Sequence, residues 1–209
     1  MKKQNLIAFG VLVLSIVFAS CKTEASKEEV TSTENKTNVL LDGTYQIDAA
    51  NSTANWQGDM LGLYSHSGVV AIKEGSVEIK DGKIVGGNIV VDMKTIMPTD
   101  NGYTKDNPKE KLLAHLMSND FFNVNDFATS TFKITGFENN EVKGDLTVRD
   151  KTNSEVAKEV NITPTDSGFK ASGKLVFNRQ NYGVAFKMPV KDKVLSDDIT
   201  LNISLAATK

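Results

Sequence analysis

Few side chains in this 209-residue sequence are of the types that commonly do chemistry. Cys21 is the only cysteine, and His66 and His115 are the only histidines. Serine and aspartate are common, but no Gly-x-Ser-x-Gly, Walker-type loop or His-Glu-x-x-His occurs, so no nucleophile with its base can be recognised. The histidines and the cysteine also lack metal-ligand spacing. We therefore expect no catalytic residue, no metal and no enzymatic activity.

Three basic side chains remain as candidates for contacting the polar end of a ligand. Lys111 and His115 are four residues apart and share one edge of a helix if this stretch is helical. Arg179 stands beside Asn178 and near Tyr182, and it could meet a phosphate. Structural roles stay open as well. His115 could bond a backbone carbonyl near a helix end, and Arg179 could pair with a buried carboxylate.

The N-terminal residues resemble a targeting signal. A basic start is followed by an apolar run, Leu6–Ser20, which is shorter than the about 20 apolar residues that span a membrane. We interpret residues 1–20 as a signal peptide that resembles those of bacterial lipoproteins, in which the following cysteine, here Cys21, is lipidated and becomes the mature N-terminus. Cys21 has no second cysteine to pair with, so its position explains it better than redox chemistry does. A plain secretory signal with cleavage nearby is the alternative.

Residues 21–38 are predicted to be the lipidated cysteine and a flexible tether. They consist mainly of Glu, Lys, Ser, Thr and Asn, contain no aromatic residue, and cannot bury enough apolar surface to offset the entropy of ordering. Residues 39–209 have the length of one domain. The net charge of −2 and the lack of a basic patch argue against a nucleic-acid partner.

Within residues 39–209, apolar residues recur at every second position, which predicts strands with one apolar face. Val69 with Ala71 and Val77 with Ile79 are examples. Turn sequences separate the alternating runs, and they include Lys73-Glu74-Gly75, Asp81-Gly82, Glu138-Asn139-Asn140 and Asp166-Ser167-Gly168. The predicted strands are 43–48, 52–58, 63–73, 76–80, 83–93, 129–138, 141–149, 155–163, 168–178, 182–188 and 196–206.

One segment has helical periodicity, and we predict a single short helix over Pro108–Met117. Asn107 is placed to cap its start, with Pro108 at the first helical position. Ser118-Asn119 is placed to end it, because Asn tolerates the left-handed conformation. The apolar face of this helix consists of Leu112, Leu113, Leu116 and Met117.

A meander of about eight or more strands must hide its edges, and closure into a barrel does so. The predicted fold is therefore mainly all-β: an antiparallel lipocalin-like β-barrel with one short helix sealing or flanking it. Such a barrel is just wide enough for side chains or for one slender ligand, so a filled core and an apolar cavity both stay open. Trp56 could close the barrel end or stack on a ligand, and Phe121 and Phe122 could pack the helix on the barrel. The candidate ligand-binding residues are Trp56, Lys111, His115, Phe121, Phe122, Phe132, Ile134, Leu146, Phe169, Ala171, Leu175, Phe177 and Arg179.

Several short motifs, spread over Thr44–Ala206, together resemble the YceI-like family. The most specific is His115-Leu116 with Ser118 and Asp120-Phe121-Phe122. The other matching pieces are Tyr45-Gln46-Ile47-Asp48 with Asn51-Ser52 and Trp56, His66-Ser67-Gly68 with Gly75, Gly87–Met93, Thr131-Phe132, Gly144–Val148, and Phe177-Asn178-Arg179 with Tyr182-Gly183. The sequence departs from the family pattern at Leu112-Leu113, where many relatives have Arg-Asp, at Arg149-Asp150-Lys151 and at Asn178.

The resemblance implies a secreted lipocalin-like barrel that binds polyisoprenoids and related long apolar molecules. It thus implies a long-chain apolar partner of isoprenoid or fatty-acyl type, with no cofactor other than such a bound lipid. Combined with the lipidated Cys21, it predicts a lipid-anchored protein of the cell envelope, on the periplasmic face or at the outer-membrane surface. A non-catalytic envelope interaction or stress protein with a filled barrel is the alternative. The oligomeric state is not predicted.

Overall fold

The structure, a computed structural model, describes residues 40–187 and 194–209. These residues belong to one compact unit. The predicted signal peptide, Cys21 and the tether (residues 1–38) lie outside the described residues. Within the described part of the chain, no helix is both long and apolar enough to cross a membrane.

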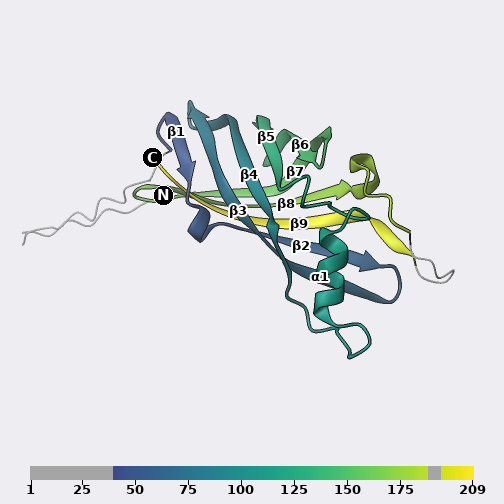
Figure 1. The fold of residues 1–209 in the computed structure, drawn as a ribbon. Helices are drawn as coiled ribbons and strands as arrows, with labels where there is room; N and C mark the ends of the chain where they lie inside the picture. Colours follow the sequence, from purple (N-terminus) through teal and green to yellow (C-terminus); the bar gives the residue numbers. More distant parts are fainter. Residues whose placement is uncertain (1–39, 188–193) are drawn as a thin grey trace, which may run out of the picture. The chain divides into compact units, whose positions relative to one another are not determined.

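The described residues form nine antiparallel strands and one α-helix, α1, over Lys109–Met117 (Figure 1). Strands β2 to β9 each pair with the next, and β2 also pairs with β9, so these eight strands form a closed barrel. This confirms the predicted lipocalin-like barrel with a single helix. The strand bounds are β1 Gly43–Ile47, β2 Thr53–Met60, β3 Tyr64–Lys80, β4 Lys83–Pro98, β5 Thr129–Glu138, β6 Glu141–Val148, β7 Lys151–Pro164, β8 Gly168–Asn178 and β9 Leu195–Thr208.

Strand β1 continues the line of β2 along the barrel wall. Both strands pair with β3 on one side and with β9 on the other. A short 3-10 turn, Ala49–Asn51, separates them, and the Asp48 carboxylate accepts hydrogen bonds from the backbone N–H groups of Ala50 and Asn51 at 3.1 and 3.3 Å. β1 and β2 therefore form one strand of the barrel wall, which the 3-10 turn interrupts.

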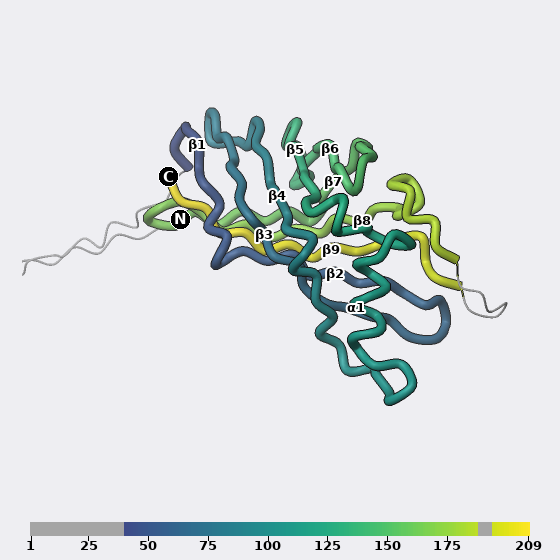
Figure 2. The backbone as a smooth tube through the Cα atoms, viewed as in Figure 1, coloured from purple at the N-terminus to yellow at the C-terminus, as the bar shows by residue number. Residues whose placement is uncertain are grey.

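The barrel interior is solid at the β1 end. The rings of Tyr45 and Phe169 pack there with their centroids 5.3 Å apart. Figure 2 shows β1 at one end of this unit and α1 at the other. Large side chains therefore occupy the barrel interior at the β1 end. The buried residues of the solid end are Tyr45, Ile47, Val77, Ile79, Ile84, Ile134, Val142, Phe169 and Ala207.

Two hairpins follow the turn chemistry of the sequence. Asp81 and Gly82 join β3 to β4 with φ angles of 50° and 69°. Asn139 and Asn140 join β5 to β6 with φ angles of 52° and 59°. Two successive residues of positive φ form the turn whose twist matches antiparallel strands, and Asp, Asn and Gly tolerate it best. Both predicted turns are therefore confirmed.

The predicted turn at Lys73-Glu74-Gly75 is wrong, because β3 runs unbroken through it. The register of β3 against β4 shifts between Ile72 and Glu74, as in a β-bulge. The bulge changes which residues face inward: Val70 and Ile72 are buried before it, and Val77 and Ile79 after it. Val69 and Ala71, predicted from the same alternation, therefore lie on the outer face.

The predicted strand over 182–188 is also absent from the part of that range that the structure describes. Arg179–Tyr182 form a 3-10 turn, η2, that begins after Asn178 and ends at Gly183 with a φ of 73°. The Asn178 side chain accepts a hydrogen bond from the Gln180 backbone N–H at 2.9 Å. This side-chain cap favours a turn over a strand.

The helix ends at Met117, before Ser118, as the sequence predicts, but the predicted Asn107 cap and the left-handed Asn119 are not found. Pro108 precedes α1 in an extended conformation, and it makes no side-chain cap. Asn107 instead accepts a hydrogen bond from the Lys111 ammonium group at 3.0 Å. Ser118 ends the helix in an extended conformation, and the left-handed residue of this region is Asn123, with a φ of 48°.

Gly68 in β3 offers a test of how tightly the barrel wall is packed. A Cβ atom at Gly68 would collide with the Met97 carbonyl oxygen and would lie 2.6 Å from the Trp56 indole. We expect Gly68→Ala to lower the free energy of unfolding by about 1–3 kcal/mol, as overpacking does. Gly136→Ala is the control, because a Cβ there meets nothing within 4 Å. Denaturant titration measures both, and equal stabilities would contradict the packing.

Candidate functional site

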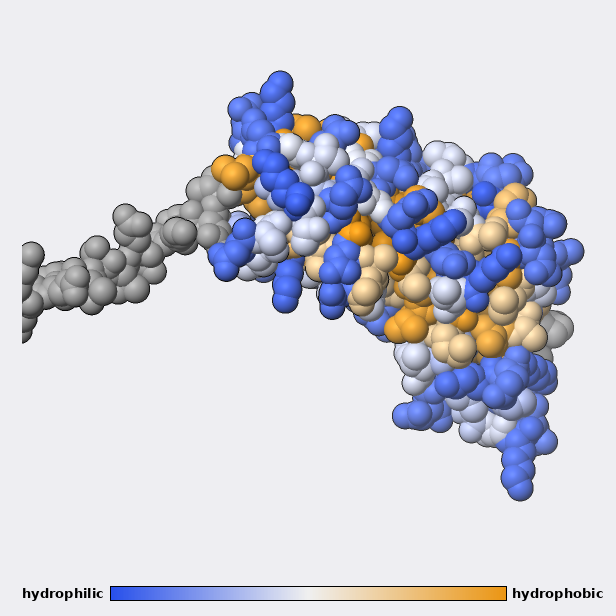
Figure 3. Space-filling view, turned by 60° about the vertical axis from the view of Figure 1, so that its left-hand side comes forward, coloured by the Kyte–Doolittle hydropathy of each residue, from blue (hydrophilic) through white to orange (hydrophobic). Residues whose placement is uncertain are grey.

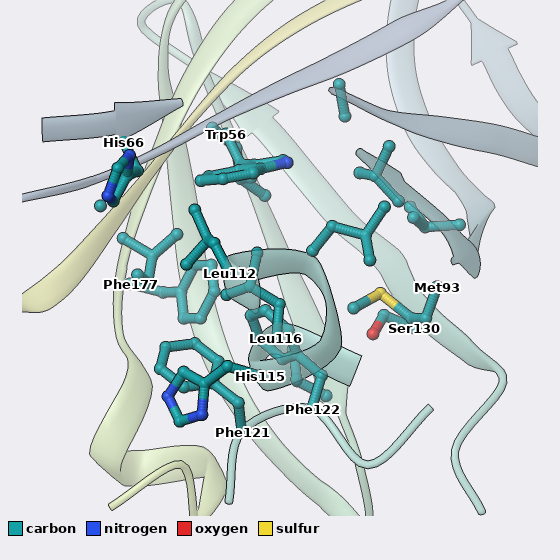
Figure 4. Close-up of a pocket in the computed structure, with 18 of the residues that line it drawn as sticks. Trp56, His66, Met93, Leu112, His115, Leu116, Phe121, Phe122, Ser130 and Phe177 are labelled. Atoms are coloured by element: carbon teal, nitrogen blue, oxygen red, sulfur yellow. The ribbon is translucent and has the colours of Figure 1, made fainter. Parts of the chain in front are cut away.

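The barrel is hollow at the α1 end, where a cavity of about 580 Å³ opens. All eight barrel strands and α1 contribute to its wall, and most of the contributing side chains are apolar. Its volume falls within the about 300–1,000 Å³ that is usual for small-molecule sites. Figure 4 shows Trp56, Phe177, Leu112 and Leu116 gathered around this space. The cavity is the candidate binding site.

Helix α1 forms one side of the cavity. Leu112 and Leu116 line it. After the helix the chain folds back, and the Phe122 backbone N–H donates to the Leu116 carbonyl at 3.1 Å. Phe121 and Phe122 then add their rings to the wall, with centroids 4.9 Å apart. The helix and the two phenylalanines therefore both seal the barrel and line its cavity.

His115 is the polar residue of this wall that sits closest to aromatic rings. Its imidazole packs edge-on against Phe186, with centroids 4.4 Å apart, and against Phe121 at 5.4 Å. Its Nε2 is buried and has no hydrogen-bond partner among the described residues. Burial lowers the pKa of His115 below its ordinary value, although the charge of Asp120 opposes this effect. The imidazole is therefore neutral at neutral pH.

A second polar cluster holds the loop after β4 against β3. The Asp100 carboxylate contacts His66 Nδ1 at 2.9 Å and accepts a hydrogen bond from the Tyr103 hydroxyl at 2.5 Å. The rings of His66 and Tyr103 are stacked, and both line the cavity. Burial raises the pKa of Asp100, but the bonds from Tyr103, His66 and the Ser67 backbone outweigh it and hold that pKa below its ordinary value. Asp100 is thus ionised, and its contacts hold the loop after β4 in place at the edge of the cavity.

Ser130 is a buried polar residue on the cavity wall. It is 6% exposed, and its hydroxyl has no hydrogen-bond partner among the described residues. Figure 4 shows Ser130 beside Met93, on a different side of the cavity from His115. A mostly apolar wall with two separate polar atoms that lack partners, His115 Nε2 and Ser130 Oγ, can bind a chain and still contact a polar group on it.

The cavity brings together most of the residues that the sequence suggested. Ile134 and Phe169 instead fill the solid end of the barrel. Ala171 packs on the core without lining the cavity. The predicted residues that do line it are Trp56, Lys111, His115, Phe121, Phe122, Phe132, Leu146, Leu175 and Phe177.

Arg179 has the structural role that the sequence left open. It is 1% exposed and does not line the cavity. Its guanidinium group donates to the backbone carbonyls of Ser196 and Val184 and pairs with Asp197 at 2.9 Å. The ion pair joins η2 to the start of β9. Asp197, whose side chain remains partly exposed, is thus the partner of a buried cation.

His66, Tyr103 and Ser130 are cavity residues that were not among the candidates. His66 and Tyr103 are brought together by Asp100, which is 34 residues from His66, so no local pattern marks them. Ser130 could have been found, because it alternates in phase with Phe132 and Ile134 and so points inward. Among the described residues, no group of three or more His, Cys, Asp or Glu side chains could hold a metal ion.

Two solved structures share this fold. BcnA from Burkholderia cenocepacia is 15% identical, with a TM-score of 0.58, over 78% of this chain and 99% of BcnA. A polyisoprenoid binding domain from Saccharophagus degradans is 10% identical, with a TM-score of 0.51, over 78% of this chain and 97% of that domain. At these identities the likeness is one of fold. The class is thus a closed antiparallel barrel with an internal cavity.

The family is defined by the sequence itself. The YceI-like domain matches residues 45–207, which is most of the chain, so this protein belongs to the YceI-like family. A UPF0312 protein from Staphylococcus aureus (strain N315) is 36% identical over 84 residues, covering 37% of this chain and 48% of the relative. A UPF0312 protein from Staphylococcus epidermidis (strain ATCC 12228) is 34% identical over 85 residues, with the same coverage. The chain spans about half the length of these curated relatives.

The lowered pKa of His115 predicts a pH dependence of stability. The unfolded chain takes up a proton near the ordinary histidine value of about 6.5, and the folded protein does so only at lower pH. Between these two values the unfolded state binds more protons, so stability is lost as the pH falls. We expect His115→Gln to lose less melting temperature than the wild type between about pH 7.5 and about pH 5.5. His66 is present in both proteins, so identical losses would show that His115 is not the group responsible.

Proposed function

We propose that this protein binds one long apolar molecule, of isoprenoid or fatty-acyl type, inside its barrel and holds it at the cell envelope. The observation that carries the proposal is the apolar cavity of about 580 Å³ at the α1 end. Apolar surface removed from water contributes about 25 cal/mol per Å², so a long chain can bind here with few polar contacts. The Saccharophagus degradans domain of the same fold, described as polyisoprenoid binding, supports this ligand class.

Polar atoms on the wall favour a ligand that is not a pure hydrocarbon. Leaving a buried hydroxyl such as that of Ser130 without a partner costs about 1–3 kcal/mol. An oxygen on the bound chain would recover this energy. Lys111, which is exposed and lines the cavity, and the buried Nε2 of His115 are the groups placed to meet the polar end of the molecule. The basic residue Arg179 is excluded from this role, because it lies outside the cavity wall.

A non-catalytic interaction protein with a filled barrel is the second candidate. The solid β1 end, with Tyr45 and Phe169 in contact, is the observation that favours it. The cavity at the other end weighs against it, because a protein that acts only through its outer surface gains nothing from an unfilled interior, which lowers its stability.

We further propose that the barrel is anchored to a membrane through the lipidated Cys21. The support is the sequence pattern alone: a basic start, a short apolar run and a cysteine, followed by residues 22–38 that are too polar to fold. A lipid anchor on a long tether would keep the barrel on the periplasmic face or at the outer-membrane surface, close to the apolar molecules that it binds.

Filling the cavity should block binding. Ala157 is buried and lines the cavity, whereas Ala171 is packed on the core outside the cavity wall. We expect Ala157→Phe to raise the Kd for a fluorescent long-chain alcohol by at least about tenfold, because one ring displaces the chain. Ala171→Phe is the matched control and should bind as the wild type does.

Circular dichroism and the melting temperature show whether each variant folds. Saturable binding that is equal in folded Ala157→Phe and in the wild type would place the ligand elsewhere. Failure of the wild type to bind any isoprenoid or fatty-acyl probe would refute the proposed function.

Lipidation of Cys21 is tested by labelling growing cells with an alkyne-bearing fatty acid. We expect the wild-type chain to carry the label and Cys21→Ala to carry none, because Cys21 is the only cysteine. Immunoblotting of whole cells controls for the amount of protein. A wild-type chain that is produced and exported without label would favour the plain secretory signal.

A further inference from the structure

The hairpin that joins β2 to β3 has an unusual tip. Its three turn residues are Leu61, Gly62 and Leu63, and Gly62 has a φ of 73°. The Leu63 backbone N–H donates to the Met60 carbonyl at 2.9 Å, which closes the turn. Gly in the left-handed position suits a three-residue hairpin. Leucine on both sides of it does not suit a solvated turn, where polar residues are the rule.

The apolar side chains at this tip form a small exposed surface, which we call the hydrophobic rim: Leu61, Leu63, Tyr64 and Val194. They are 55, 57, 46 and 55% exposed. Val194 belongs to the rim because its carbonyl accepts a hydrogen bond from the Leu61 backbone N–H at 2.9 Å. Scattered exposed apolar residues need no explanation, but a cluster on one tip does. Hydrophobic residues also gather in one area on the face that Figure 3 shows.

The rim is continuous with the cavity. Met60 and Tyr64, which pair across the base of the tip, both line the cavity wall, as does Leu195 next to Val194. Just below them, the Asp59 carboxylate accepts hydrogen bonds from Gln57 at 2.9 Å and from Ser65 at 2.6 Å. These bonds fix the two strands that carry the tip. The hairpin thus exposes Leu61 and Leu63 at the edge of the cavity, on two strands that these bonds hold rigid.

We propose that the hydrophobic rim docks on a lipid bilayer, so that the barrel exchanges its ligand directly with the membrane. A long apolar chain that crossed water would lose the hydrophobic driving force that holds it in either place. If the edge of the cavity is inserted in the bilayer, the chain passes from membrane to cavity without crossing water. Tyr64 fits the membrane interface, because its ring is apolar and its hydroxyl is polar. The ligand exchange rests on the proposed function, whereas the docking does not.

The size of the rim favours a bilayer over a protein partner. Four side chains are far fewer than the roughly 20–30 residues a side of a stable protein interface. Shallow insertion of a few apolar side chains into the boundary of headgroups and acyl chains needs no matching surface. Lys111, exposed on the same cavity wall, adds a cation that attracts anionic lipids.

Docking can be measured without any ligand. Cys21 is the only cysteine, so Leu63→Cys in the full-length chain with Cys21→Ser carries one environment-sensitive fluorophore at the tip. Leu41→Cys in the same background is the control, because Leu41 is 64% exposed and lies before β1, at the solid end. We expect a blue shift of the tip label with vesicles of phosphatidylethanolamine and phosphatidylglycerol, and none at Leu41. A tip label that stays water-exposed would overturn the proposal, and so would a shift without vesicles, which would indicate contact with another copy.

Ligand exchange is measured by the transfer of a fluorescent long-chain alcohol from the same vesicles to the protein. We expect Leu61→Ser with Leu63→Ser to slow transfer by about tenfold while the Kd stays that of the wild type, because the rim lies outside the cavity wall except at Tyr64. Leu41→Ser with Val85→Ser removes equally exposed apolar residues elsewhere and should change neither quantity. Equal transfer rates in all three proteins would overturn direct exchange. If the wild type binds no probe but the tip label still shifts, the proposed function fails and the docking stands.

Discussion

The pairing of β2 with β9 is the interaction on which the rest of the structure depends. It joins the ends of the meander, so that eight strands enclose an interior. Without it, the side chains that alternate inward along each strand would face solvent. The pairing joins residues that are far apart in the chain, such as Trp56 with Leu201, so its formation has a large entropic cost of closure.

Closure creates an interior, but the side chains decide how much of it is filled. At the β1 end, the buried rings of Tyr45 and Phe169 pack against each other and fill the interior between them. Toward α1 the wall includes Ala54, Ala157 and Gly58, whose small side chains do not reach the middle. The depth to which a chain can enter is therefore set by where the large residues begin. The solid end supports the hollow end, and both follow from one alternating pattern.

Much of this could be predicted from the sequence, because it depends on neighbours in the chain. The hairpins at Asp81-Gly82 and Asn139-Asn140 follow from residues that tolerate positive φ, and the closed barrel follows from the number of alternating strands. The phase of β3 could not be predicted, because the bulge after Ile72 is set by pairing with β4. The cluster of His66, Asp100 and Tyr103 was missed for a similar reason: its members meet only in the folded barrel. Ile134 and Phe169 were predicted to bind the ligand but lie in the solid end. Alternation predicts which face of a strand points inward, but not how far along the barrel a residue lies.

A cavity of this kind lowers stability, because the atoms around it lack packing partners on one side. The barrel keeps it open by fixing its borders with polar contacts that cannot slide. Asp100 fastens the loop after β4 to β3, and Arg179 fastens η2 to the start of β9. Arg149 joins a third pair of segments, donating to the Phe121 carbonyl at 3.3 Å and to the Gly183 carbonyl at 2.9 Å. Directional bonds of this kind hold loops where apolar packing alone would let them collapse into the space. The hollow end is thus a consequence of where the polar residues lie as much as of the apolar ones that line it.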